Sequence, residues 1–267
     1  MTNSAGRVLI IAGSDSGGGA GIQADIKTVT ALGGYAATAI TAVTVQNTLG
    51  VQAIHPIPLD IILGQARAVL EDIGADAIKI GMLGEATVVE AIARLLQESP
   101  GLPAVIDPVM TAKGGRLLAG DGAMDAVQAL LVPAATLLTP NAPEAAALTG
   151  LAVETTDDLR RAGDALLALG AKAVLMKGGH IPGERVVDLL MTGGGELTLE
   201  GPRVESRHTH GTGCTLASAC AVGLAQGMTL ELAVARAWRY TAEAIARAPG
   251  FGAGAGPLDH AWPLRKG

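Results

Sequence analysis

The chain has 267 residues and a formal net charge of −6, with 19 Lys and Arg against 25 Asp and Glu. Hydrophobic residues make up 49% and charged residues 16%, so the composition predicts a large folded core and argues against disorder. The negative charge and the absence of a Lys/Arg run argue against nucleic acid as the main partner.

The chain has two cysteines, Cys214 and Cys220, six positions apart in a predicted helix. This spacing puts them about 9 Å apart along the helix axis and on different faces, so they cannot bridge each other. No closely spaced Cys/His cluster predicts a zinc site. The first apolar run is too short for a signal peptide, and no uninterrupted apolar run reaches membrane-spanning length. We therefore expect a soluble, cytoplasmic protein without a membrane segment.

From residue 8 to residue 178, apolar runs rich in β-branched residues alternate with runs of helical period. The predicted elements in chain order are a strand at 8–13, a helix at 21–33, strands at 36–46 and 51–57, a helix at 59–74, a strand at 77–82, a helix at 85–99, a strand at 104–109, a helix around 121–131, a strand at 136–140, a helix at 156–170 and a strand at 173–178. Repeated strand–helix pairs with continuously apolar strands predict a mostly parallel sheet with helices on both faces.

The pattern changes after residue 185. The segment 185–204 predicts a hairpin turning at Gly193–Gly195, which would add antiparallel strands to the edge of the sheet. Helices at 213–226 and 229–248 follow, and then an irregular tail rich in Gly and Pro. No shift in composition marks a linker, so we expect one α/β domain over residues 1–267. In such sheets, ligands bind at the carboxyl ends of the strands.

A glycine-rich segment, AGSDSGGGAGIQAD (12–25), follows the first predicted strand and opens a helix. Gly19, Gly21 and Ala24 match the dinucleotide fingerprint G-x-G-x-x-A. That fingerprint also needs an acidic residue about 20 positions further on, and the next one after Asp25 is Asp60. Some of these glycines can serve packing alone, whereas Asp25 is a candidate for binding a polar ligand group. No P-loop and no G-x-S-x-G motif occurs.

Polar residues also follow three later strands. Asp107 comes at the end of an apolar strand, where a turn or cap is the ordinary role. Asn141 and Glu144 are spaced as a helix cap, although an amide and a carboxylate could equally face a hydrated Mg²⁺. Lys177 follows the strand at 173–178, and surface exposure is its ordinary state.

The most specific motif is HGTGC (210–214), directly before a strongly helical run. Backbone N–H groups from Gly211 to Cys214 would converge on one point, and the helix dipole adds positive potential there. This geometry predicts an anion site and a lowered pKa for Cys214. Cys214 could be a nucleophile, a proton acceptor or a small core residue; the core role suits Cys220 better.

Together these motifs resemble the hydroxymethylpyrimidine/phosphomethylpyrimidine kinases of thiamine biosynthesis, within the ribokinase-like superfamily. The matching stretches occur in the family's order, at 12–28, 41–52, 79–83, 105–110, 137–150, 174–180 and 208–219. The resemblance implies a three-layer α/β/α fold. It also implies ATP-dependent phosphorylation of 4-amino-5-hydroxymethyl-2-methylpyrimidine, first to the monophosphate and then to the diphosphate.

The resemblance also implies roles for individual positions. The residues expected around the pyrimidine are Gly13, Asp25, Gln46, Met82 and Val109. Asn141 and Glu144 would organise Mg²⁺ and the nucleotide phosphates, with Asp107 as a second Mg²⁺ ligand, partly through water. Lys177 would contact the phosphates of ATP. The residues expected to form the catalytic anion hole are Gly211, Thr212 and Gly213, with Cys214 as the general base that accepts the hydroxymethyl proton.

Three other functions stay open at the level of sequence. The first is a pyridoxal or pyridoxine kinase, which shares the fold and the cysteine motif. The second is an NAD-dependent oxidoreductase, against which the missing acidic residue counts. The third is a binding protein without catalysis. The resemblance further suggests a homodimer through the strands near 36–57, and the segment 111–122 is a candidate mobile loop over the site.

Overall fold

The structure, a computed structural model, describes residues 5–111, 115, 118 and 120–265. Within them, one nine-stranded sheet has the strand order β3-β2-β1-β4-β5-β6-β7-β8-β9. The strands are β1 (Arg7–Asp15), β2 (Tyr35–Asn47), β3 (Gly50–Pro56), β4 (Ala77–Ile80), β5 (Ala104–Ile106), β6 (Leu137–Leu138), β7 (Ala173–Met176), β8 (Arg185–Thr192) and β9 (Gly195–Pro202). Neighbouring strands from β2 to β7 pair in parallel, and β3, β8 and β9 add antiparallel pairs at the two edges. The predicted mostly parallel sheet with antiparallel edges is confirmed.

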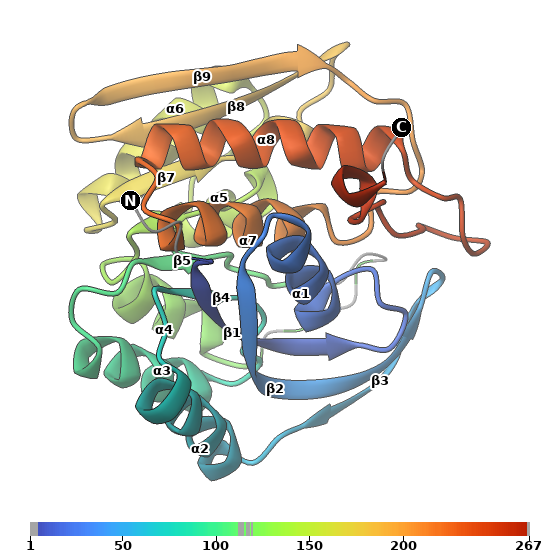
Figure 1. Ribbon diagram of the computed structural model, residues 1–267. Helices are drawn as coiled ribbons and strands as arrows, with labels where there is room; N and C mark the ends of the chain where they lie inside the picture. The colour runs from blue at the N-terminus through green and yellow to red at the C-terminus, as the bar shows by residue number, and fades with distance from the viewer. Residues whose placement is uncertain (1–4, 112–114, 116–117, 119, 266–267) are drawn as a thin grey trace.

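Helices cover both faces of this sheet (Figure 1). They are α1 (Gly21–Ala31), α2 (Leu59–Ala68), α3 (Ala86–Glu98), α4 (Ala123–Ala126), α5 (Ala142–Thr149), α6 (Thr156–Ala168), α7 (Thr212–Ala225) and α8 (Leu230–Ala246). One core joins the sheet to α2, α3, α5 and α6, and the other joins it to α1, α7 and α8. Strand β1 shows why there are two cores: Leu9 and Ile11 enter the first, whereas Val8 and Ile10 enter the second, because successive side chains point to opposite faces. In the part of the chain that the structure describes, no helix combines the length and apolarity needed to span a bilayer.

The central strands are shorter than predicted, for a chemical reason. β5 ends at Ile106 and β6 at Leu138, and Pro108 and Pro140 follow closely. Proline has no N–H to continue the hydrogen bonds between strands. Both β5 and β6 therefore end early, and the chain continues as a loop at the carboxyl ends of the strands. In the candidate mobile loop at 111–122, positions 112–114, 116–117 and 119 lie outside the described residues.

Candidate active site

A cluster of buried charges lies where β5 and β7 end. The Lys177 Nζ is 2.8 Å from Asp107 Oδ1 and 3.8 Å from Glu144 Oε2, and Thr139 donates a hydrogen bond of 3.0 Å to Asp107. Lys177 is only 9% exposed, so its ordinary surface role does not apply here. Asp107 likewise acts as an ion-pair partner rather than a simple turn residue. Burial alone would lower the pKa of Lys177. The negative charges of Asp107 and Glu144 outweigh this effect, so the pKa of Lys177 is raised.

Asn141 and Glu144 form the helix cap that their spacing predicts. The Glu144 backbone N–H donates to the Asn141 side chain, and the Asn141 backbone N–H donates to Glu144 Oε2. Burial raises the pKa of Glu144 to about 7, although Lys177 and the cap hydrogen bonds oppose this. The cap hydrogen bond therefore uses Oε2 of Glu144, and the same oxygen faces Lys177 Nζ.

The start of α7 lies directly beside this charge cluster. Gly211 has a φ of 84°, which suits glycine, and the helix begins at Thr212. A Cβ on Gly213 would lie 3.1 Å from Lys177 Nζ and 3.2 Å from Asp107 Oδ2. The first amides of a helix have no acceptor within the helix, so these amides and the ammonium group of Lys177 supply hydrogen-bond donors for an anion at this corner, while Asp107 and Glu144 balance the charge of Lys177.

Cys214 lies in the first turn of α7, and its environment differs from the expectation. It keeps some exposure, but desolvation by the surrounding protein raises its pKa to about 12. The charge of Lys79 and a hydrogen bond from the Gly21 N–H oppose this shift, whereas Asp25 and Asp107 reinforce it. The predicted lowering of the pKa is therefore wrong, because desolvation and nearby carboxylates outweigh the helix terminus and the charge of Lys79.

Asp25 is inaccessible to a ligand, in contrast to the expectation that it would contact one. Its carboxylate is fully buried, with Oδ2 2.9 Å from Lys79 Nζ and Oδ1 accepting a hydrogen bond of 2.7 Å from Ser218. Burial raises the pKa of Asp25 although Lys79 opposes this. The pair joins α1, β4 and α7 beneath the site, which makes Asp25 a support for the site.

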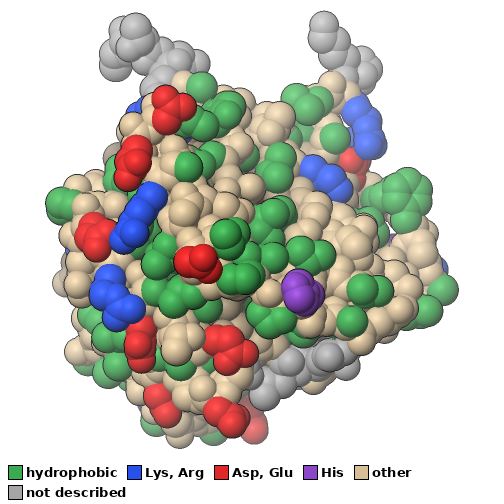
Figure 2. All heavy atoms as spheres, turned by 90° about the horizontal axis from the view of Figure 1, so that it is seen from below, with side chains coloured by type: hydrophobic (Ala, Val, Ile, Leu, Met, Phe, Trp, Pro, Cys, Tyr) green, Lys and Arg blue, Asp and Glu red, His purple; other side chains and the backbone are tan. Residues whose placement is uncertain are grey.

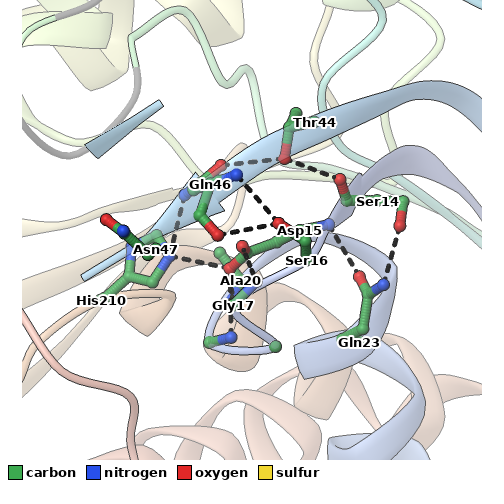
Figure 3. A network of polar contacts seen from close by, with 12 residues as sticks. Ser14, Asp15, Ser16, Gly17, Ala20, Gln23, Thr44, Gln46, Asn47 and His210 are labelled. Atoms are coloured by element: carbon green, nitrogen blue, oxygen red, sulfur yellow. Dashed lines mark hydrogen bonds and ion pairs between the residues drawn. The ribbon is translucent and has the colours of Figure 1, made fainter. Parts of the chain in front are cut away.

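The other residues expected around a ring-shaped ligand lie at the carboxyl ends of β1, β2, β4 and β5. A Cβ on Gly13 would lie 2.4 Å from Met82 Cε, so the glycine leaves room for the Met82 side chain. Val109 is half-buried just beyond the end of β5, and its N–H bonds to the Asp107 carbonyl. Gln46, at the end of β2, is also half-buried. Its backbone N–H and carbonyl both form hydrogen bonds with the hydroxyl group of Ser16 in the glycine-rich loop (Figure 3).

The sequence patterns did not single out Asp15, Lys79 or His210. Lys79 stands inside the apolar strand AIKIGM, and this placement was the available signal for a buried ion pair. Asp15 ends β1, where it accepts backbone hydrogen bonds from Gly17, Gly19 and Ala20 and lies 2.9 Å from the His210 ring (Figure 3). That contact joins residues 195 positions apart, which no local pattern reveals.

A second surface feature adjoins Lys177. An open hollow of about 410 Å³ is lined by Thr156 of α6, the segment Gly178–Arg185 in part, and Val187 of β8. Behind it, buried Asp188 accepts a hydrogen bond of 2.7 Å from the Gly178 N–H, and burial raises the pKa of Asp188 to about 6. Gly178, which follows Lys177 in the chain, is part of the lining of this hollow.

The donor set for a cation is small. Among the described residues, no group of three or more His, Cys, Asp or Glu side chains converges as a metal site. Among the described residues, Asp107 forms its contacts through Oδ1 and Glu144 through Oε2, which leaves the second oxygen of each without a contact there. Two carboxylates with free oxygens fit Mg²⁺, which retains several waters and is completed by substrate phosphates.

Comparison with known proteins agrees with this arrangement. Residues 15–259 match the family described as phosphomethylpyrimidine kinase. The hydroxymethylpyrimidine/phosphomethylpyrimidine kinase of Streptomyces coelicolor is 50% identical over 96% of this chain and 95% of its own. Among solved structures, the phosphomethylpyrimidine kinase of Clostridium difficile is 42% identical with a TM-score of 0.80, covering 90% of this chain and 99% of its own. An ADP complex of Bacillus subtilis pyridoxal kinase is 35% identical with a TM-score of 0.89, covering 97% and 99%. The chain belongs to the phosphomethylpyrimidine kinase family.

Proposed function

We propose that this enzyme transfers the γ-phosphoryl group of ATP to the hydroxymethyl oxygen of 4-amino-5-hydroxymethyl-2-methylpyrimidine, and then phosphorylates the monophosphate to the diphosphate. The observation that carries the proposal is the start of α7 beside the Lys177–Asp107 pair, at the same edge of the sheet as Gly13, Met82 and Gln46. The names of curated relatives that are 44% and 50% identical to this chain support this substrate over pyridoxal. We propose that residues 1–267 act as a single kinase domain.

The pyrimidine would bind against the carboxyl ends of β1, β2 and β4. Gly13 and Met82 would contact its faces, Val109 its rim, and Gln46 its polar edge. A carboxamide both donates and accepts hydrogen bonds, which suits an aminopyrimidine. Asp25 would not contact the pyrimidine; it would support the site through its ion pair with Lys79.

Phosphoryl transfer needs positioning and charge neutralisation more than covalent chemistry. The amides of Gly211, Thr212 and Gly213 would receive the transferred group, and Lys177 would neutralise phosphate charge. Cys214 would accept the hydroxymethyl proton as that oxygen bonds to phosphorus and ADP leaves. Because burial keeps the thiol protonated at neutral pH, it must first release its own proton to solvent before it can accept one; the charge of Lys79 and the positive end of α7 favour that release.

For the nucleotide, Asn141, Glu144 and Lys177 would lie along the phosphates, and the hollow beside Gly178 would take the nucleoside. Asp107 and Glu144 would hold Mg²⁺, partly through water, and the ion would supply charge neutralisation at the phosphates.

The proposal includes a homodimer. Large apolar side chains are exposed on β2, its turn to β3, and α2, namely Val43, Val45, Leu49 and Ile61. Figure 2 shows hydrophobic side chains gathered on this side of the molecule, with charged side chains around and between them. Such a patch on an edge hairpin is typical of a protein interface. Light scattering on the purified protein should give twice the mass of one chain.

The function is tested by measuring kcat/KM with ATP for the pyrimidine, its monophosphate and pyridoxal, each in separate assays that resolve the products. The proposal predicts that both pyrimidine compounds are better substrates than pyridoxal. A larger kcat/KM for pyridoxal would refute it.

A further inference from the structure

His210, just before α7, contacts Asp15 at the end of β1 and Gln46 at the end of β2, so three segments of the chain meet at its side chain. It precedes Gly211, and its ring Nε2 lies 2.9 Å from Asp15 Oδ2 and 3.0 Å from the Gln46 carboxamide (Figure 3). His210 is 8% exposed and Asp15 is 3% exposed. Close packing forces this approach: a Cβ on Gly19 would lie 2.6 Å from His210 Cδ2, and one on Gly211 would lie 1.8 Å from the Gly19 carbonyl oxygen. Both positions therefore require glycine.

The donor count fixes the proton on His210. The Asp15 carboxylate already accepts from the N–H groups of Gly17, Gly19 and Ala20. Burial opposes its ionisation, but His210 and these backbone donors outweigh burial and hold the pKa of Asp15 below its usual value. An ionised carboxylate can only accept, so Nε2 of His210 carries a proton and donates it.

The proton on His210 Nε2 determines whether the oxygen or the nitrogen of the Gln46 carboxamide faces the ring. The two ends of a carboxamide have nearly the same shape, so its hydrogen-bond partners decide which end is oxygen. With Nε2 of Gln46 toward His210, two donors would face each other, and Thr44 would have to donate its single proton to both Gln46 and the Ser14 carbonyl. With Oε1 toward His210, the single Nε2–H of the ring is shared between Asp15 Oδ2 and Gln46 Oε1, the amide donates to Thr44 Oγ1, and Thr44 donates to the Ser14 carbonyl. Only this orientation avoids two donors facing each other.

We propose that His210, held by Asp15, is a positioning residue that sets the polarity of the Gln46 carboxamide and thereby selects the ring edge that the site accepts. In this orientation Gln46 keeps one N–H and one oxygen lone pair for a ligand, in a fixed order. A ring nitrogen beside an exocyclic amino group, as in a 4-aminopyrimidine, matches that donor and acceptor. The inference rests on the proposed function, because Gln46 matters only if it contacts the substrate ring.

The kinetic test is a double-mutant cycle with His210→Leu, Gln46→Leu and the combined variant. His210→Leu is expected to raise KM for the pyrimidine about 10- to 100-fold, as for a lost substrate hydrogen bond, and to change KM for ATP less than about threefold. His210→Gln, which keeps an N–H donor, is expected to recover most of that loss. His208→Leu, in the same loop, is the control and should change KM for the pyrimidine less than about twofold.

The decisive arm of the cycle is the combined variant. If His210 acts through Gln46, adding His210→Leu to Gln46→Leu costs less than about twofold in kcat/KM for the pyrimidine. If His210→Leu costs the same factor with and without Gln46, His210 acts on the anion hole or on folding, and the proposal is overturned.

A second readout does not depend on the substrate. Long-range ¹H–¹⁵N spectra of the whole protein, assigned with His210→Gln, should show that Nε2 of His210 carries a proton. An unprotonated Nε2 would overturn the proposal. A wild-type protein that shows the protonated Nε2 but does not phosphorylate the pyrimidine would refute the proposed function while leaving the proton on His210 Nε2 established.

Discussion

Lys79 Nζ lies 2.9 Å from Asp25 Oδ2, and both side chains are completely buried beneath the first turn of α7. The residues are 54 positions apart in the chain, and the pair ties β4 to α1. Ser218 of α7 donates to the other oxygen of Asp25, so a third element depends on the same carboxylate. The support beneath the start of α7 therefore depends on a buried ion pair.

Lys79→Met leaves the Asp25 carboxylate buried and unpaired, and we expect a loss of about 3–5 kcal/mol in the free energy of unfolding. Adding Asp25→Asn removes the uncompensated charge and should restore at least about 2 kcal/mol of it. The control is Arg67→Met, which breaks an exposed ion pair with Glu98 and should cost less than about 1 kcal/mol. Urea unfolding measures all three. Equal losses for Lys79→Met and the double variant would show that the charge is not the cause.

Gly213→Ala places a Cβ 3.1 Å from Lys177 Nζ and 3.2 Å from Asp107 Oδ2. Displacing these charged groups should lower kcat by at least about tenfold, as expected when phosphate-stabilising groups move. The control is Gly193→Ala in the β8–β9 turn, where no atom lies within 4 Å of the added methyl group. Steady-state kinetics and thermal unfolding separate the effects. An unchanged kcat in Gly213→Ala would contradict the position assigned to the anion site.

Asn141 has a cap role in the structure and a proposed role toward the nucleotide. Asn141→Ala should cost about 1 kcal/mol in the free energy of unfolding, because the cap hydrogen bond to the Glu144 N–H is lost. Asn141→Ser keeps a capping oxygen, so its stability should return to nearly that of the wild type. Its kcat/KM for ATP should stay about tenfold low, as when one hydrogen bond to a charged group is missing. If Asn141→Ser recovers both the stability and the kcat/KM for ATP of the wild type, Asn141 has only a capping role and its proposed role toward the nucleotide is contradicted.

His260 provides a test by pH. It is 4% exposed and lies 2.9 Å from Thr215 Oγ1, and burial, with a smaller effect of Lys27, lowers its pKa to about 4. Between that value and the unfolded pKa of about 6.5, only the unfolded chain binds the proton, so stability falls as the pH falls. This histidine alone should cost about 2 kcal/mol between about pH 7 and about pH 5.

The matched variant is His260→Gln, which can still bond to Thr215 but does not titrate. Urea unfolding at the two pH values should show a smaller loss in the variant by that amount. Buried Asp188 acts in the opposite sense, since its pKa is raised to about 6, but it is present in both proteins and cancels in the comparison. An identical loss in wild type and variant would contradict a neutral buried His260.

The sequence predicted the sheet well because its signals are local. Apolar strands followed by helical runs gave the parallel centre, the Gly193–Gly195 turn gave the β8–β9 hairpin, and the spacing of Asn141 and Glu144 gave a cap that the structure contains. Strand lengths were overestimated where proline follows closely, as at Pro108.

The electrostatic state of the site could not be predicted in the same way. A lowered pKa for Cys214 followed from the helix terminus alone, whereas the opposite shift depends on burial and on Asp25 and Asp107, far away in the chain. Surface exposure was the ordinary role of Lys177 at the level of sequence, because its ion-pair partner Asp107 lies 70 positions away. The link from Asp15 through His210 to Gln46 also joins distant segments, so only the folded structure reveals it.

The central claim is that Cys214 serves as the base for the first transfer, to a hydroxyl group, and is dispensable for the second, in which the acceptor is already an anion. The most direct measurement follows the pyrimidine, its monophosphate and its diphosphate separately during turnover by the wild type and by Cys214→Ala. We predict that the wild type makes both products, that the variant loses at least about 100-fold in the first step, as for a missing general base, and that its second step changes less than about tenfold. Equal losses in the two steps would contradict the role assigned to Cys214.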